Sequence, residues 1–240
     1  WMKRMGASDD PFAGDTTLQT SMWKRVTAAA EKYNQPGKFT AFIGFEWTSM
    51  PSGANLHRNI IFRDGKDKAD QTTPISAYDT VDPEKLWEWM SAYEQKTGGR
   101  MLAIPHGGNL SNGLMFDDVT LTTRKPIDRA YAIQRMKWEP LYEVTQMKGD
   151  AETDPATSPN DEFSDFERWN RGSFGAEPKT AEMLRKEPAR AALLRGLAYD
   201  AKLGVNPYKF GMVGSTDAHT SLATTQEDNF FGKVVPLEPS

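Results

Sequence analysis

The chain contains three histidines, and each lies next to an apolar segment near glycine or other small residues. They are His57 in NLHRNIIF, His106 in MLAIPHGGN and His219 in GMVGSTDAH. Asp217 lies two residues before His219, and Glu46 follows the apolar run FIGF. Imidazole and carboxylate groups are the usual ligands of Zn, Mn and Fe. The five side chains therefore indicate a metal site, provided that the fold brings them together.

Two apolar segments in the first third of the chain predict how Glu46 and His57 meet. Residues 39–45 and 58–63 are rich in aromatic and β-branched residues, and the turn segment 51–53 lies between them. We expect an antiparallel hairpin. In a hairpin, the start of the second strand lies beside the end of the first, so His57 would lie next to Glu46.

The rest of the chain alternates between helical and strand patterns from residue 83 onward, which favours a parallel sheet or a barrel. We expect helices at 16–33, 83–97, 126–137 and 180–203, with further strands at 101–104, 141–145 and 208–213. In parallel α/β folds, residues just past the carboxyl ends of strands line the active-site mouth. His106, Asp217 and His219 each follow a predicted strand, so we expect them at the same rim as Glu46.

Composition limits the classes of function. The 240 residues suffice for one domain with a substantial core, so we expect a single domain over residues 1–240. A net charge of −4 gives no basic field for a nucleic-acid partner. No run approaches the roughly 18 apolar residues of a membrane span. With no cysteine, thiolate metal sites are excluded. Residues 147–178 are polar and acidic, and we interpret them as a long loop or lid.

Four segments together resemble the DUF3604 family, which is related to the PHP (polymerase and histidinol phosphatase) superfamily of metal-dependent hydrolases. They are FIGFEWTSMPSGANLHRNIIFRDG, MLAIPHGGN, YEVTQMKGDAETD and GMVGSTDAHTSLATTQEDNFFGK. The resemblance implies an α/β fold, a distorted (β/α)7 TIM-like barrel of PHP type. It also implies two or three divalent metal ions (Zn, Mn or Fe) at the carboxyl ends of the strands, with five ligands in this chain: Glu46, His57, His106, Asp217 and His219.

One departure from the PHP pattern stands out. The chain contains no His-x-His and no Thr-Asp-His segment, which the family places near its first strand. We therefore expect an incomplete barrel, from an internal fragment of a longer protein that lacks the N-terminal strands. Exposed sheet edges associate readily, so a second copy of the chain is an expected cover for them.

The leading hypothesis is a metal-dependent hydrolase acting on a small anionic substrate, with a phosphoester favoured by the resemblance. Metal-activated water would attack the phosphorus. Arg58 is the expected clamp for an anionic oxygen. Glu143, near a strand end, is expected either to support a metal ligand or to contact the substrate.

Two alternatives remain open. An amidohydrolase-type barrel cleaves C–N or C–O bonds with similar ligands, although it normally has a His-x-His. A non-catalytic module could bind carbohydrate through some of the seven tryptophans. Trp87 and Trp89 lie two apart on a predicted helix, a spacing more typical of one core residue and one surface residue than of a stacking platform.

Overall fold

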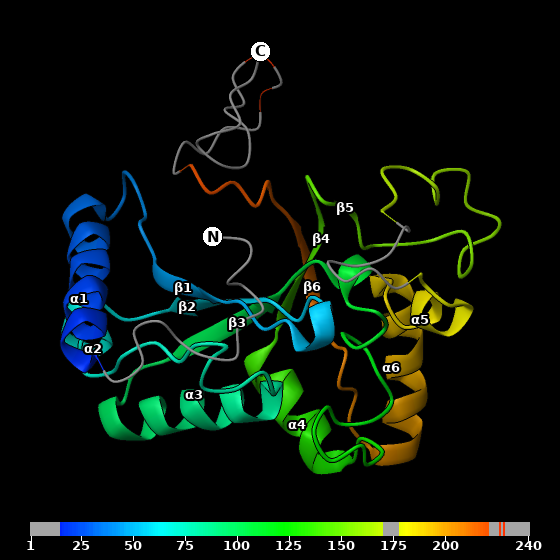
Figure 1. Cartoon of the computed structure of the whole chain (residues 1–240), viewed down its shortest axis with the longest axis horizontal. Helices are drawn as coiled ribbons and strands as arrows, with labels where there is room; N and C mark the ends of the chain where they lie inside the picture. The colour runs from blue at the N-terminus through cyan, green and yellow to red at the C-terminus, as the bar shows by residue number, and fades with distance from the viewer. Residues whose placement is uncertain (1–14, 170–177, 221–225, 227, 229–240) are drawn as a thin grey trace.

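The computed structural model describes residues 15–169, 178–220, 226 and 228 (Figure 1). Its α-helices are α1 (Thr16–Tyr33), α2 (Lys66–Ala69), α3 (Pro83–Thr97), α4 (Arg129–Trp138), α5 (Ala181–Arg185) and α6 (Ala189–Leu203). Its strands are β1 (Ile43–Trp47), β2 (Arg58–Phe62), β3 (Met101–Pro105), β4 (Leu141–Gln146), β5 (Gly149–Asp150) and β6 (Gly211–Gly214). Two 3-10 turns, η2 (Pro51–Gly53) and η3 (Gly108–Leu110), precede β2 and follow β3.

The first sheet has the order β1-β2-β3, and both pairings are antiparallel. The predicted hairpin between β1 and β2 is confirmed, with Glu46 opposite Asn59. On the other side of β2, Asn59 is opposite Ile104 of β3. Because successive side chains in a strand point to opposite faces, this register places Glu46, Asn59 and Ile104 on one face of the sheet.

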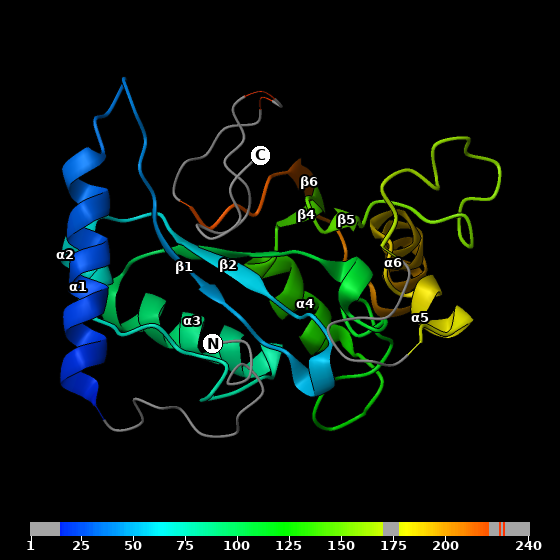
Figure 2. The same cartoon turned by 45° about the horizontal axis from the view of Figure 1, so that its top comes forward.

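The opposite face of this sheet is packed into a hydrophobic core. Ile60 and Phe62 of β2 pack with side chains of α1 and α3 there, among them Trp23 and Trp87. Figure 2 shows α3 running beneath the strands of this sheet. Among the described residues, α1 and α3 therefore cover one face of this sheet, and Glu46 lies on the other face. Trp89 is partly buried against the same core, so neither tryptophan of the α3 pair stands free on the surface.

Helix α3 shows how local sequence sets the helix bounds. Asp82 caps its amino end by accepting a hydrogen bond from the backbone N–H of Glu84, and Pro83 takes the first helical position. Gly98 ends the helix in a left-handed conformation with φ of 62°. The observed bounds are those predicted from the sequence. Within the described residues, no helix is long and apolar enough to cross a membrane.

The second sheet has the order β5-β4-β6 and packs against a second hydrophobic core. Only β4 and β6 run parallel, and β3 lies beside β4 where the two sheets meet. Over the described residues the strands form two three-stranded sheets and no closed barrel, so the expectation of a (β/α)7 barrel is corrected to a mixed α/β fold. The prediction of a parallel sheet from residue 83 onward fails at β3. The neighbour of β3 is β2, which lies between β1 and β3 and runs antiparallel to both.

Some predicted bounds also shift. Residues 39–42 lie outside β1, and Phe39 and Phe42 are exposed rather than buried. Phe39 instead forms an isolated bridge with Gln35 just after α1. The predicted helix at 180–203 is split into α5 and α6 at Pro188, where the sequence places a restart. Of the predicted loop at 147–178, Gly149–Asp150 form β5, residues 151–169 contain turns and no helix or strand, and residues 170–177 lie outside the described residues.

Candidate metal centre

Glu46, His57 and His106 meet on the face of the first sheet that lies opposite α1 and α3. One oxygen of Glu46, Oε1, lies 2.8 Å from Nδ1 of His57 and 3.0 Å from Nε2 of His106. His57 comes one residue before β2 and His106 one residue after β3, and the backbone N–H of His106 donates to the carbonyl of His57 at 3.3 Å. The three side chains form a group that could hold a metal ion. Three of the five predicted ligands are thus in direct contact.

The electrostatics of this group suit metal binding. Burial alone would raise the pKa of Glu46, but hydrogen bonds from His106 and His57 outweigh it and hold that pKa well below its usual range. Burial lowers the pKa of His57 below its ordinary value of 6.5, despite the opposing hydrogen bond with Glu46. An ionised carboxylate and a neutral imidazole are the forms that bind metal.

Asn55, which sequence reasoning missed, joins the two histidine segments. Its side-chain N–H groups donate to the carbonyls of His106 and Gly107, both at 3.0 Å, and its Oδ1 accepts from the backbone N–H of His57 at 3.4 Å. Asn55 is fully buried. Its position in a Pro-Ser-Gly-Ala-Asn loop gave no signal beyond ordinary turn chemistry.

Gly107 leaves the room that Asn55 needs, and its replacement by alanine is expected to cost at least about 2 kcal/mol of stability and to weaken metal binding. An added Cβ would lie 2.1 Å from Nδ2 of Asn55, and φ at this position is +63°. Gly98→Ala is the matched control, because φ there is +62° and nothing lies within 4 Å of the added Cβ. The control should lose only about 1–2 kcal/mol. Equal losses in urea unfolding of the two variants would contradict the role given to Asn55.

The last two predicted ligands, Asp217 and His219, lie close to this group. Nε2 of His219 is 3.9 Å from Oε2 of Glu46, and Nδ1 of His219 donates to the carbonyl of Asp217 at 2.7 Å. That bond leaves Nε2 as the nitrogen directed at the centre, an arrangement typical of metal-binding histidines. The carboxylate of Asp217 is engaged elsewhere, with Oδ2 lying 2.5 Å from Nζ of Lys148.

Glu143 of β4 completes the cluster. Burial raises the pKa of Glu143 above its usual 4.5, and the charges of His106 and Lys148 act against that rise. Gln146 donates to its Oε2 at 3.2 Å. Carboxyl groups with raised pKa values inside a site are candidates for proton transfer. Lys148 was not singled out by the sequence, where a lysine in a polar loop has no distinguishing mark.

The structure does not bring Arg58 together with the histidines. Arg58 follows His57 in the chain, so its side chain points to the opposite face of the sheet. There its Nε donates to Oε1 of Glu139 at 3.0 Å, and both side chains are buried. Nε of Arg135 lies 3.2 Å from the other oxygen of Glu139. Arg58 thus belongs to a buried ion-pair network beneath the sheet.

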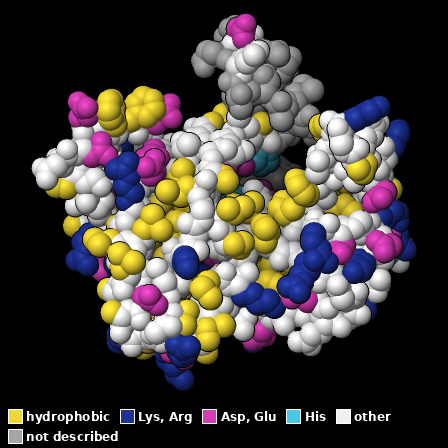
Figure 3. Space-filling model, turned by 180° about the vertical axis from the view of Figure 1, so that it is seen from behind, with side chains coloured by type: hydrophobic (Ala, Val, Ile, Leu, Met, Phe, Trp, Pro, Cys, Tyr) yellow, Lys and Arg dark blue, Asp and Glu magenta, His cyan; other side chains and the backbone are white. Residues whose placement is uncertain are grey.

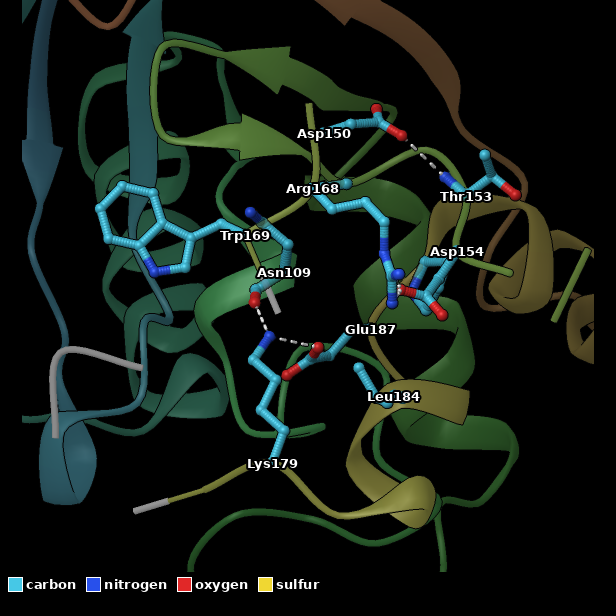
Figure 4. A pocket seen from close by; sticks show the side chains of 11 residues that line it. Asn109, Asp150, Thr153, Asp154, Arg168, Trp169, Lys179, Leu184 and Glu187 are labelled. Atoms are coloured by element: carbon cyan, nitrogen blue, oxygen red, sulfur yellow. Dashed lines mark hydrogen bonds and ion pairs between the residues drawn. The ribbon is translucent and has the colours of Figure 1, made fainter. Parts of the chain in front are cut away.

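A hollow in the molecular surface contains histidine side chains at its floor, with carboxylates beside them (Figure 3). A small pocket lies near the cluster. Asn109 lines this pocket and donates from Nδ2 to the carbonyl of Lys148 at 3.0 Å. Figure 4 shows Arg168 reaching Asp154 and Lys179 reaching Glu187 across this pocket. Asn109 therefore connects the pocket to the turn that carries Lys148.

Glu187 makes stability depend on pH. Burial raises its pKa from 4.5 to about 7, although the Lys179 ammonium 2.7 Å away opposes the rise. The folded chain therefore retains this proton to a higher pH than the unfolded chain, so stability is lost as pH rises from about 4.5 to about 7.

The expected loss is on the order of 1–3 kcal/mol, and Glu187→Gln should abolish it. The check is urea unfolding of both proteins at pH 5 and pH 7.5. Comparing the change with pH within each protein cancels any constant cost of the substitution. Parallel pH profiles would rule out Glu187 as the source.

Comparison with known proteins decides the family. The sequence profile of DUF3604, described as a protein of unknown function, matches residues 3–240. The chain belongs to the DUF3604 family. No curated protein and no solved structure matches it significantly. The DUF3604 part of the sequence resemblance is thus confirmed, whereas nothing in these comparisons links this DUF3604 chain to the PHP superfamily.

Proposed function

We propose that this chain is a metal-dependent hydrolase that cleaves a phosphoester in a small anionic substrate. The observation that carries the proposal is the contact of one Glu46 oxygen with two histidine nitrogens on the face of the first sheet opposite α1 and α3. A carboxylate and two imidazoles are a ligand set that suits Zn, Mn and Fe.

The donor set fits a metal ion in its dimensions. A tetrahedral ion with bonds of about 2.0–2.1 Å keeps its ligand atoms about 3.3 Å apart. The Glu46–His57 and Glu46–His106 separations of 2.8 and 3.0 Å need to open by only a few tenths of an ångström.

The chemistry divides between the ion and the chain. A bound divalent cation supplies Lewis acidity and lowers the pKa of water towards neutrality. Glu46, His57 and His106 hold the cation, and His219 approaches from the opposite carboxylate oxygen of Glu46. Glu143 is the chain's own proton-holding group, because its buried carboxyl has a raised pKa and lies within electrostatic range of His106.

The choice of a phosphoester rests on the sequence resemblance to PHP enzymes, and the same centre is compatible with the amidohydrolase reaction. We would load the purified chain with Mn²⁺ and offer it p-nitrophenyl phosphate, bis(p-nitrophenyl) phosphate and p-nitrophenyl acetate. The proposal predicts release of p-nitrophenol from a phosphoester, dependent on metal and lost in His106→Ala. Cleavage of the acetate alone by a metal-loaded chain would favour the carbon-ester or amide alternative.

A further inference from the structure

Lys148 is an unusual residue to find inside a cluster of histidines and carboxylates. It lies in the turn between β4 and β5 and is only 8% exposed. Its Nζ is 2.5 Å from Oδ2 of Asp217, and its positive charge acts on both His57 and Glu143. Lysine is almost never this deeply buried unless it is paired. The ammonium group is therefore part of the centre rather than a surface charge.

The backbone holds Lys148 in this place. Asn109 donates to its carbonyl at 3.0 Å from the pocket side. The next residue, Gly149, has φ of +100°, and a Cβ there would lie 2.7 Å from the carbonyl oxygen of Glu167. A glycine is thus required for the turn that directs Lys148 inwards. Two independent contacts fix the position of this lysine.

The charges of the cluster suggest what the ammonium does. The Lys148 ammonium offsets the charge of Asp217. The carboxylate of Glu46 is left for a single divalent cation, which Glu46, His57 and His106 would hold. Asp217, which the sequence marks as a ligand, is held by the ammonium instead.

We propose that Lys148 is a built-in cation that takes the place of a second metal ion: it holds Asp217 and limits the centre to one divalent ion. This inference rests on the metal binding in the proposed function and is independent of the reaction catalysed. Removing the ammonium leaves Asp217 and Glu143 without their fixed positive neighbour, so a second ion is drawn to these two carboxylates.

The test is calorimetric titration of the metal-free chain with Mn²⁺. The wild-type chain is expected to bind one ion, and Lys148→Met two, with the second bound at least about tenfold more tightly than any second ion in the wild type. Lys148→Arg keeps the charge and should bind one. Lys179→Met is the matched control, because the side chain of Lys179 is also largely buried but pairs with Glu187 outside the centre. Circular dichroism checks that each variant folds, and Lys148→Gln is a second variant for the same test.

The outcomes separate the two proposals. The role of Lys148 would be overturned if the wild-type chain bound two ions. It would also be overturned if the wild-type chain, Lys148→Met and Lys148→Gln each bound one ion. Either result would leave the metal centre standing. No ion in the wild-type chain would overturn both. A second ion in Lys179→Met as well would show that the effect follows net charge rather than Lys148, and would also overturn the inference.

Discussion

His106→Ala is expected to weaken divalent metal binding by at least about 100-fold. Replacing a residue that only hydrogen-bonds to a metal ligand already lowers metal affinity or activity by about 10–100-fold. His106 is fully buried, and its Nε2 lies 3.0 Å from the shared oxygen of Glu46. Alanine leaves two of the three closest ligands, and no other histidine is near enough to substitute in the described structure, since His219 contacts the far oxygen of Glu46.

The measurement is titration of the metal-free protein with Mn²⁺ or Zn²⁺, with His219→Ala as a graded comparison. His219 has a side chain 43% exposed and lies 3.9 Å from Glu46, so its removal should cost less than removal of His106. Unchanged affinity in His106→Ala, with the fold intact, would be incompatible with the centre described above. A larger loss in His219→Ala would mean that the ion lies nearer Asp217.

Glu139→Gln is expected to destabilise the fold by about 3–5 kcal/mol, the usual cost of breaking a buried ion pair. Glu139 is 4% exposed and accepts from Nε of Arg58 and Nε1 of Trp87, while Arg135 lies against its other oxygen. Glutamine removes the negative charge that offsets two buried guanidinium groups. The loss should appear as a lower urea midpoint with an unchanged dependence on denaturant.

Glu88→Gln provides the control for this prediction. Glu88 pairs with Lys85 on the surface of α3, where the two side chains are 65% and 59% exposed, so its loss should cost less than about 0.5 kcal/mol. The folded fraction of Glu139→Gln should bind metal as the wild type does, since the network lies on the opposite face of the sheet. Wild-type stability in Glu139→Gln would show that the network contributes little.

The contact of Glu46 with His57 could be predicted because two simple rules act together. The position of His106 beside them depends on the pairing of β2 with β3, which is not local in sequence. Strand ends were visible from apolar runs, and a hairpin places the start of one strand beside the end of the other. Successive side chains in a strand point to opposite faces of the sheet, so every second residue lies on the same face. This also explains why Arg58, which follows His57, points away from the centre. Both rules are local, so a single sequence is enough to apply them.

The parts that could not be predicted depend on contacts between distant segments. The order β1-β2-β3 places an antiparallel strand where helix–strand alternation favours a parallel neighbour, and periodicity carries no information on strand order. Asn55 and Lys148 look like ordinary loop residues in the sequence. Their roles depend on Gly107 and Asp217, which are brought to them only by the tertiary fold.

The most direct test of the metal centre is X-ray absorption spectroscopy on the chain loaded with one equivalent of Zn²⁺ or Mn²⁺. The arrangement described above predicts at least two imidazole ligands together with carboxylate oxygen, with Zn–N distances of about 2.0–2.1 Å. The imidazole signal should fall by one ligand in His57→Ala. A stoichiometric ion surrounded by oxygen alone, or a chain that binds no stoichiometric ion, would contradict the assignment of Glu46, His57 and His106 as its ligands.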